Sequence, residues 1–500
     1  MNLHEKIGQL FTPAAYIHDT EENILAMERL ITEQGIGGIT FFHSRHSAAA
    51  NFEQRQEQLS YEQTLEKLIA LINRYQALSK IPLLISIDAE FGLAMRIEDT
   101  PHYPFSIAMG ALTMEHLSWV EAYGERIGRD LKACGIHLNF APVADINTNP
   151  KNPVIGYRSF GTDREKVSAF ALACFQGMKK AGIAACYKHF PGHGDTAVDS
   201  HLGLPIINKS KAVLLEEELY PFIQGIAAGI DMIMVGHLAI PSLTKGESIP
   251  ATISKAIITG LLRQELSFDG IVVSDALNMK AVANMFSEPG QLEFEAFAAG
   301  TDLLCFSEHV AEGIAKIVQF GNQDQIERSF ERIQELKISL GLLAHKPLAV
   351  PSFDFQGVHA FNKQLAKKYI HVFHRRSDLD QISASAGLII GPIQQNHFRK
   401  DARYPVFHSI DELMAAIPPT RAVTVSLFVP SAKPVKNFGL EMSDLENLDK
   451  LTRHYLVDLY LFGNPLCLRL IPSWEAMRSI TVAYHGFEEN QQVVFEAFGG

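Results

Sequence analysis

Short apolar runs alternate with longer amphipathic segments through the first 330 residues of the chain. The short runs predict buried strands, and the segments between them predict helices. Alternation of this kind is typical of βα units built around a parallel sheet. Seven units can be counted, which approaches the eight of a (β/α)8 barrel. The predicted strands are Gly38–Phe42, Leu83–Ile87, His137–Phe140, Ala184–Tyr187, Met232–Val235, Ile271–Ser274 and Leu303–Phe306.

A second, shorter series of strands and helices follows a segment that has no periodicity. Residues 313–343 predict a helix that ends in a Gly-Leu-Leu turn, and the proline-rich stretch after it predicts a linker. Apolar runs then recur at 387–390, 422–429, 456–462 and 480–484, with helix-like segments between them. We therefore expect a barrel domain at 1–345, a linker at 346–360 and a smaller α/β domain at 361–500.

Polar side chains stand at or just past the carboxyl ends of most predicted strands in the first part. A single one of them could be a helix cap. Six on one face of a sheet are better explained by an active site, which (β/α)8 barrels build on this face. Asp302 also lies beside a predicted strand, but a structural role explains it equally well and we leave it outside the site. The six positions are His43, Asp88, Asp145, Lys188 with His189, His237 and Asp275.

Residues 184–206, AACYKHFPGHGDTAVDSHLGLPI, concentrate ionisable groups behind a short apolar run. His189 and His193 have the spacing of a helical metal pair, but the Pro-Gly between them prevents a shared helix face. We expect neither a metal nor another cofactor. The better explanation is proton transfer by Asp199-Ser200-His201, because a carboxylate two residues away can orient an imidazole and stabilise its charged form.

The motif KHFPGHGDTAVDSH resembles the signature loop of the β-N-acetylglucosaminidase branch of glycoside hydrolase family 3. Three further segments resemble the same family: SIDAEFGLAMR, NFAPVADINTNPKNPVIGYRSFG and IVVSDALNMKAV. Together they span most of residues 1–345. The resemblance implies a (β/α)8 TIM-like barrel followed by a smaller α/β sandwich domain.

The resemblance also assigns roles to individual residues. It implies that Asp275, a carboxylate that also ends a predicted buried strand, is the nucleophile, and that His201 with Asp199 is the acid and base. One position departs from the family pattern, because Phe91 stands where many members have glycine, which puts the aglycone preference in question. The residues expected to bind the terminal sugar are Asp88, Arg158, Lys188, His189 and, from its strand-end position, His237.

These residues predict a retaining exo-β-N-acetylglucosaminidase that removes terminal β-linked N-acetylglucosamine from muropeptides or amino-sugar oligosaccharides. Three alternatives stay open. The same residues could use phosphate in place of water, since a histidine repels phosphate less than a carboxylate does. The chain could be a β-glucosidase of the family, although the Asp-Ser-His loop argues against this. It could also be a non-catalytic protein that binds sugar or peptidoglycan.

Composition narrows the partners and the compartment. A net charge of −12 argues against nucleic acid, which favours a basic surface. The five cysteines are widely spread and lack a C-x-x-C pair, so we expect reduced, buried thiols and no disulfides. No segment has the roughly 20 apolar residues of a membrane span. We expect a cytoplasmic enzyme with a small carbohydrate substrate, unless an export signal has been removed; the oligomeric state stays open.

Overall fold

The computed structural model describes residues 1–44, 62–196, 203–344, 346–376, 383–391 and 405–498. The chain forms two compact units. The first comprises Met1–Tyr103, Met114–Ile155 and Ser159–Asp354. The second comprises Pro104–Thr113, Gly156–Arg158 and Phe355–Gly500. Two short segments from the first part of the sequence therefore belong to the second unit.

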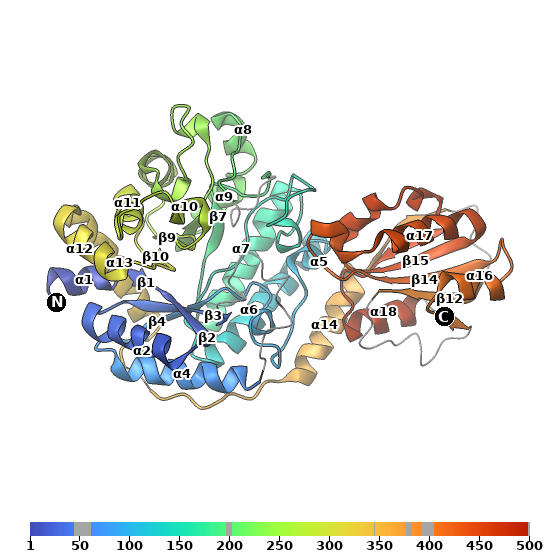
Figure 1. Cartoon of the computed structure of the whole chain (residues 1–500), viewed down its shortest axis with the longest axis horizontal. Helices are drawn as coiled ribbons and strands as arrows, with labels where there is room; N and C mark the ends of the chain where they lie inside the picture. The colour runs from blue at the N-terminus through green and yellow to red at the C-terminus, as the bar shows by residue number, and fades with distance from the viewer. Residues whose placement is uncertain (45–61, 197–202, 345, 377–382, 392–404, 499–500) are drawn as a thin grey trace. The chain divides into compact units, whose positions relative to one another are not determined.

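The first unit is built on parallel strands arranged in three sheets (Figure 1). Their orders are β2-β3-β4-β5-β6, β7-β8-β9 and β1-β10. Isolated parallel bridges also join Val143, beyond β5, to Lys188 on β7, and Val273 on β9 to Leu303, just before β10. The strands are β1 (Phe11–Thr12), β2 (Ala14–His18), β3 (Gly38–Ser44), β4 (Leu84–Ile87), β5 (Leu138–Asn139), β6 (Ala184–Ala185), β7 (Tyr187–Phe190), β8 (Met232–Val235), β9 (Ile271–Ser274) and β10 (Leu304–Cys305).

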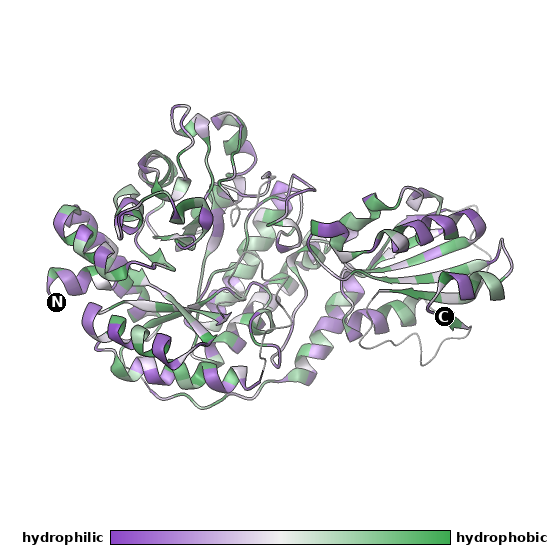
Figure 2. Ribbon diagram, in the orientation of Figure 1, coloured by the Kyte–Doolittle hydropathy of each residue, from purple (hydrophilic) through white to green (hydrophobic). Residues whose placement is uncertain are grey.

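Burial explains why short apolar runs form these strands. Every residue of β4, β7, β8 and β9 is buried, as expected for a parallel sheet that is covered on both faces. Amphipathic helices supply the cover, and Figure 2 shows their polar residues in purple beside the green strands. The main helices are α2 (Glu21–Arg29), α4 (Thr64–Leu78), α6 (Leu117–Ala133), α7 (Arg164–Ala181), α9 (Tyr220–Ala227), α11 (Gln291–Ala299), α12 (Val310–Phe320) and α13 (Gln323–Ser339).

Helices α6 and α7 pack so closely that glycine is required where they touch. A Cβ atom on Gly124 would lie 2.2 Å from the carbonyl oxygen of Cys174, and one on Gly177 would lie 2.0 Å from that of Glu121. Both distances are far below van der Waals contact. The two glycines therefore set the spacing of the helices that precede β5 and β6.

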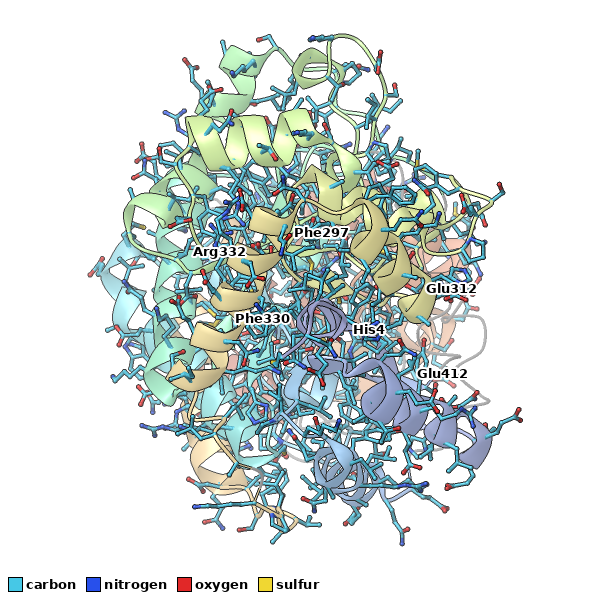
Figure 3. All side chains as sticks on the ribbon, turned by 90° about the vertical axis from the view of Figure 1, so that its left-hand side faces the viewer. His4, Phe297, Glu312, Phe330, Arg332 and Glu412 are labelled. Carbon is cyan, nitrogen blue, oxygen red and sulfur yellow. The ribbon has the colours of Figure 1, made fainter. Side chains whose placement is uncertain are left out.

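The short helix α1 (Leu3–Gly8) packs against α12 and α13. Lys6 on α1 forms an ion pair of 2.6 Å with Glu327 on α13, and its Nζ atom lies 5.6 Å from the ring centre of Phe330. Figure 3 shows this side of the first unit, with His4 on α1 and Phe330 and Arg332 on α13. Helix α1 is thus fixed against α12 and α13, the helices that follow β10, the last strand of the first unit.

The second unit contains a six-stranded sheet of order β11-β16-β15-β14-β12-β13. Strand β11 runs antiparallel to β16, and the other neighbours pair in parallel. Its strands are β11 (His371–Arg375), β12 (Ala384–Ile390), β13 (Val406–Phe407), β14 (Ala422–Phe428), β15 (Leu456–Phe462) and β16 (Ser479–Val482). Its longer helices are α14 (Phe355–Tyr369), α16 (Ile410–Ala416), α17 (Met442–His454) and α18 (Glu488–Phe498).

Each of the seven predicted strands of the first unit has a counterpart in the structure. The strands β1 and β2 were not predicted, because His18 and the proline between the two strands interrupt their apolar pattern. Strand β11 was predicted as part of a helix, because it follows α14 directly. Lys188 and His189 lie inside β7 and not beyond a strand end, since the strand breaks at Cys186 and resumes at Tyr187. Helix α14 begins at Phe355, within the stretch predicted as a linker.

The structure also bears on the cysteines and on the possibility of a membrane span. All five cysteines are free and buried, which agrees with the prediction of buried thiols. Within the described part of the chain, no helix combines the length and the apolar character needed to cross a bilayer.

Candidate active site

Strands β4, β7, β8 and β9 bring most of the predicted site residues to their carboxyl ends. Asp88 follows β4 directly and Asp275 follows β9 directly, while His237 lies two residues past β8. Lys188 and His189 lie within the last residues of β7. An ion pair of 2.6 Å between Lys188 Nζ and Asp88 Oδ1 joins two of these strands at this end.

Lys188 is the centre of a chain of alternating charges. Its ammonium lies 2.6 Å from a carboxylate oxygen of Asp88 and 2.6 Å from one of Glu90. The side chains of Lys188 and Glu90 are each 2 % exposed, so neither charge would be stable there without the other. Asp88 is 28 % exposed and forms a second ion pair of 3.2 Å with Arg96. Asp88 is therefore held by two cations and still reaches the surface.

Arg96 and Asn139 hold the turn after β4 in place. Arg96 Nε donates to the carbonyl of Asp88 at 2.9 Å, and its guanidinium lies 3.7 Å from the ring centre of Phe42. The Asn139 amide accepts from the N–H of Ala89 at 3.0 Å and donates to its carbonyl at 2.9 Å. Ala89 stands between Asp88 and Glu90, the two carboxylates that bind Lys188. The two hydrogen bonds from Asn139 to Ala89 therefore hold both carboxylates in place.

Glu90, Arg96 and Asn139 were not among the predicted site residues. Glu90 and Arg96 lie in the segment SIDAEFGLAMR that carried the family resemblance, so the signal was available. Asn139 sits inside an apolar strand, and nothing in the sequence alone shows that its amide faces the backbone of Ala89. Phe91, the departure from the family pattern, is 4 % exposed. Its effect on aglycone preference stays a prediction.

His189 is held by Asp145, a fully buried carboxylate beyond β5. The imidazole Nδ1 lies 2.7 Å from Asp145 Oδ2, and the His189 backbone N–H also donates to the carboxylate, at 3.1 Å. A third donor is the backbone N–H of His193, at 2.7 Å. Burial, the largest influence, raises the pKa of Asp145, but His189 and His193 together bring that pKa below its ordinary value. Asp145 is therefore an ionised acceptor at neutral pH.

Asp275 is partly exposed and has a fixed orientation. Its backbone N–H donates to Val235 on β8 at 2.9 Å, and its Oδ1 accepts the N–H of Ala276 at 2.8 Å. Desolvation, the largest influence, raises the pKa of Asp275, but His237, His189, the Ala276 N–H and Lys188 outweigh it and leave the pKa lowered. The carboxylate is thus ionised at neutral pH.

His237 is fully buried and bound to protein at both ring nitrogens. Nδ1 lies 2.7 Å from the Thr252 hydroxyl, and Nε2 donates to the carbonyl of Ala276 at 2.8 Å. The ring therefore fixes the residue directly after Asp275. This geometry favours a role in orienting Asp275, whereas the sequence predicted a contact with the sugar.

The predicted proton-transfer residues Asp199, Ser200 and His201 lie outside the described residues. The residues on both sides of this segment are described, and ion pairs and a hydrogen bond hold them in place. Before it, Asp195 pairs with Lys209 at 3.1 Å, and Lys209 also pairs with Glu217 at 2.8 Å. The Asn152 amide donates to the carbonyl of His193 at 2.9 Å.

The sequence also named Arg158, His43 and Asp302. Arg158 ends the short helix η6 (Gly156–Arg158), which belongs to the second unit. His43 lies within β3, 4.8 Å between ring centres from His18, and burial lowers its pKa to about 4. Asp302, which the sequence analysis leaves outside the site, precedes β10 at the amino end of the strands.

His189 and His193 have the spacing of a helical metal pair, but they lie on a strand and in the loop after it, not on a helix. The rings of His189 and His193 are 5.8 Å apart between centres and tilted by 68°. Burial, and then the charge of His189, lower the pKa of His193 to about 4. Over the ranges that the structure describes, no three His, Cys, Asp or Glu side chains are grouped to hold a metal ion.

Comparison with known proteins places the chain in a family. The N-terminal domain of glycosyl hydrolase family 3 matches residues 2–336, more than half of the chain. The chain is 34 % identical over 342 residues to "Beta-hexosaminidase A" of Pseudoalteromonas piscicida, covering 63 % of this chain and 55 % of that protein. It is 28 % identical over 376 residues to "Beta-N-acetylglucosaminidase/beta-glucosidase" of Cellulomonas fimi, covering 72 % and 61 %.

The chain thus spans less than two thirds of the length of these two relatives. A solved structure of a glycoside hydrolase family 3 β-N-acetylglucosaminidase from Paenibacillus sp. str. FPU-7 superposes with a TM-score of 0.79. The sequence identity is 26 %, and the match covers 99 % of this chain and 96 % of that one. The likeness therefore includes both units. On the family match over residues 2–336, this chain belongs to glycosyl hydrolase family 3.

Proposed function

We propose that the chain is a retaining exo-β-N-acetylglucosaminidase. The observation that carries this proposal is Asp275, an ionised carboxylate at the carboxyl end of β9 whose orientation is fixed by two backbone hydrogen bonds. Such a group is suited to attack an anomeric carbon. The relatives named β-hexosaminidase and β-N-acetylglucosaminidase support N-acetylglucosamine as the sugar.

In the proposed reaction, Asp275 attacks C1 of the sugar and forms a covalent glycosyl-enzyme, while the glycosidic C–O bond breaks. His201, oriented by Asp199, gives a proton to the leaving oxygen. In the second half, His201 takes a proton from the incoming water, which attacks C1 and releases Asp275. Two displacements return the original configuration, so the enzyme retains stereochemistry.

The sugar is bound, on this proposal, by Asp88, Arg158, Lys188 and His189. Buried hydroxyl and amide groups cost about 1–3 kcal/mol each when left without a partner, so charged groups in a rigid frame give selectivity. The ion pairs among Glu90, Lys188, Asp88 and Arg96 provide that frame. We place His237 with Asp275, as an orienting group.

We propose further that the first unit is a (β/α)8 barrel. The series of parallel pairs from β2 to β6 and from β7 to β9, the two bridges and the β1-β10 pair support closure. We also propose the domain boundaries 1–345 and 361–500, with an α/β sandwich in the second domain. A cytoplasmic location, no cofactor, and substrates derived from peptidoglycan or amino-sugar oligosaccharides complete the proposal.

One alternative has an observation in its favour. The Cellulomonas fimi relative carries both N-acetylglucosaminidase and glucosidase in its name, so a β-glucosidase activity is a second candidate. An aryl β-N-acetylglucosaminide and the matching aryl β-glucoside, each assayed with and without phosphate, separate the possibilities. Release of N-acetylglucosamine with retained configuration supports the proposal. Faster cleavage of the glucoside, or a sugar 1-phosphate as product, contradicts it.

A further inference from the structure

Asp145 was singled out by its place beyond a predicted strand, yet the proposed reaction gives it no part. Its carboxylate is fully buried and accepts three N–H groups, all of them from β7 and the residues just after it. We propose that Asp145 is a positioning residue that fixes the tautomer and orientation of His189 beside Asp275. The proposal rests on the proposed function, because it assumes that Asp275 and His189 act on the sugar.

The tautomer follows from hydrogen-bond chemistry. Asp145 is ionised and can only accept, so the Nδ1 atom of His189, 2.7 Å from Oδ2, must carry a hydrogen. The proton of the neutral ring is therefore on Nδ1, and Nε2 presents a lone pair. A sugar hydroxyl that meets Nε2 would then donate to it. Asp145 thus decides whether His189 accepts from the substrate or donates to it.

Asp145 also links His189 to the proposed nucleophile. The imidazole of His189 is one of the influences that keep the pKa of Asp275 low, so the two side chains lie within electrostatic reach. A ring free to turn about its bond to Cβ would not keep that relation. With Nδ1 held at 2.7 Å and the backbone N–H held by the same carboxylate, the ring has one orientation.

A purely structural role is the alternative to be tested. Asp145 binds the backbone of His193, and the neighbouring backbones touch closely, since a Cβ on Gly194 would lie 1.7 Å from the carbonyl oxygen of Ile146. Loss of the carboxylate could simply loosen this loop. In that case, the effect of the loss would not depend on the imidazole of His189.

The first measurement is made on the wild-type enzyme, and a variant serves only to assign a signal. In the wild-type enzyme labelled with ¹⁵N-histidine, the signal of His189 is assigned by its disappearance in His189→Gln. We expect the neutral ring to carry its proton on Nδ1. A proton found on Nε2 would overturn the proposal, whether or not Asp145→Asn folds.

The second measurement is a double-mutant cycle on an aryl β-N-acetylglucosaminide. Asp145→Asn keeps the shape but turns an N–H₂ toward Nδ1, which reverses the tautomer. We expect kcat/KM to fall about 100-fold, as for a catalytic group moved out of place. In a His189→Gln background, the same change should have little further effect.

Asp302→Asn is the matched control, because Asp302 is an equally buried acceptor at the other end of the strands. It should lower stability and leave kcat/KM of the folded enzyme unchanged. If Asp145→Asn is equally damaging with and without His189, Asp145 only supports the loop and the proposal fails. If the wild type does not cleave the substrate at all, the proposed function fails, while the tautomer measurement still stands.

Discussion

Two groups of buried charges lie at opposite ends of the parallel strands of the first unit, and they differ in what surrounds the carboxylates. At the amino end of β10, Asp302 accepts the Val272 N–H at 2.8 Å, the Ser329 hydroxyl at 2.7 Å and Arg332 at 3.2 Å, and it also pairs with Arg263. Every acceptor site is used and the side chain is 1 % exposed. Nothing remains to bind a ligand.

At the carboxyl ends, Asp275 has the opposite surroundings. It accepts the N–H of Ala276 and is partly exposed. Lys188, His189 and His237 act on it through space. Asp88 likewise retains exposure despite two ion pairs. A carboxylate saturated with hydrogen bonds holds structure together, whereas one that is oriented and ionised but not saturated can react. The predictions below test this difference.

The largest contrast is expected between Asp275→Ala and Asp302→Ala. The first should reduce turnover by several orders of magnitude, on the order of 10⁴ or more, with little change in stability. The second should destabilise the fold by about 2 kcal/mol or more, since Arg263 and Arg332 lose their partner. Steady-state kinetics and urea unfolding of both proteins measure the two effects. Equal activity losses would remove the distinction between the two ends.

Lys188→Met should harm both activity and stability, because it leaves Glu90 buried without its cation. Adding Glu90→Gln should restore much of the stability, since no charge is then left buried. It should not restore activity, because the proposed sugar contact of Lys188 is still missing. Recovery of activity in the double variant would show that Lys188 serves only to neutralise Glu90.

His201→Ala tests the proton transfer assigned to the segment that the structure does not describe. We expect a large loss on substrates with poor leaving groups and a small one on activated aryl substrates, which need little protonation. Asp199→Asn should show the same trend more mildly, because the imidazole remains but loses its orienting charge. The measurement is a plot of log kcat/KM against leaving-group pKa. A mutational loss that does not change along this plot would contradict the assignment.

The smallest effect on activity concerns Lys337, which is fully buried on α13 and donates to Gln9 Oε1 at 2.8 Å. Burial lowers its pKa in the folded state to about 7. The unfolded state binds more protons between that value and the ordinary lysine pKa, so stability should rise with pH by up to about 1.4 kcal/mol per unit from pH 7 to 10. Lys337→Met should flatten this rise and leave kcat unchanged. An unchanged slope in urea unfolding would show that Lys337 stays charged.

Much of this arrangement could be predicted from the sequence. The runs before Asp88 and Asp275 are continuously apolar, and such runs are recognisable because parallel strands are buried on both faces. The strands around Thr12 and His18 were missed because polar residues and a proline interrupt them. The pairing of Lys188 with Glu90, and of His189 with Asp145, depends on which side chains meet across neighbouring strands. Sequence spacing carries no information on such contacts.

Asp302 is a second case in which the sequence does not reveal the side-chain contacts. The sequence places Asp302 just before the predicted strand 303–306, at the amino end of the strands, but it does not show which side chains Asp302 binds. Only the structure shows that Arg263 and Arg332, distant in sequence, converge on it. Family resemblance helped where a motif matched residue by residue, as at Asp275. It assigned no role to Asn139 or Asp145, although both lie in the segment NFAPVADINTNPKNPVIGYRSFG that resembles the family.

The central claim is that Asp275 is the nucleophile of a retaining reaction. A mechanism-based fluorosugar related to N-acetylglucosamine should accumulate as a glycosyl-enzyme, because the fluorine slows the second step more than it slows the first. Peptide mass spectrometry of the trapped protein then locates the sugar. We predict a label on the peptide that contains Asp275, and no label in Asp275→Ala. A label on any other residue would contradict the account.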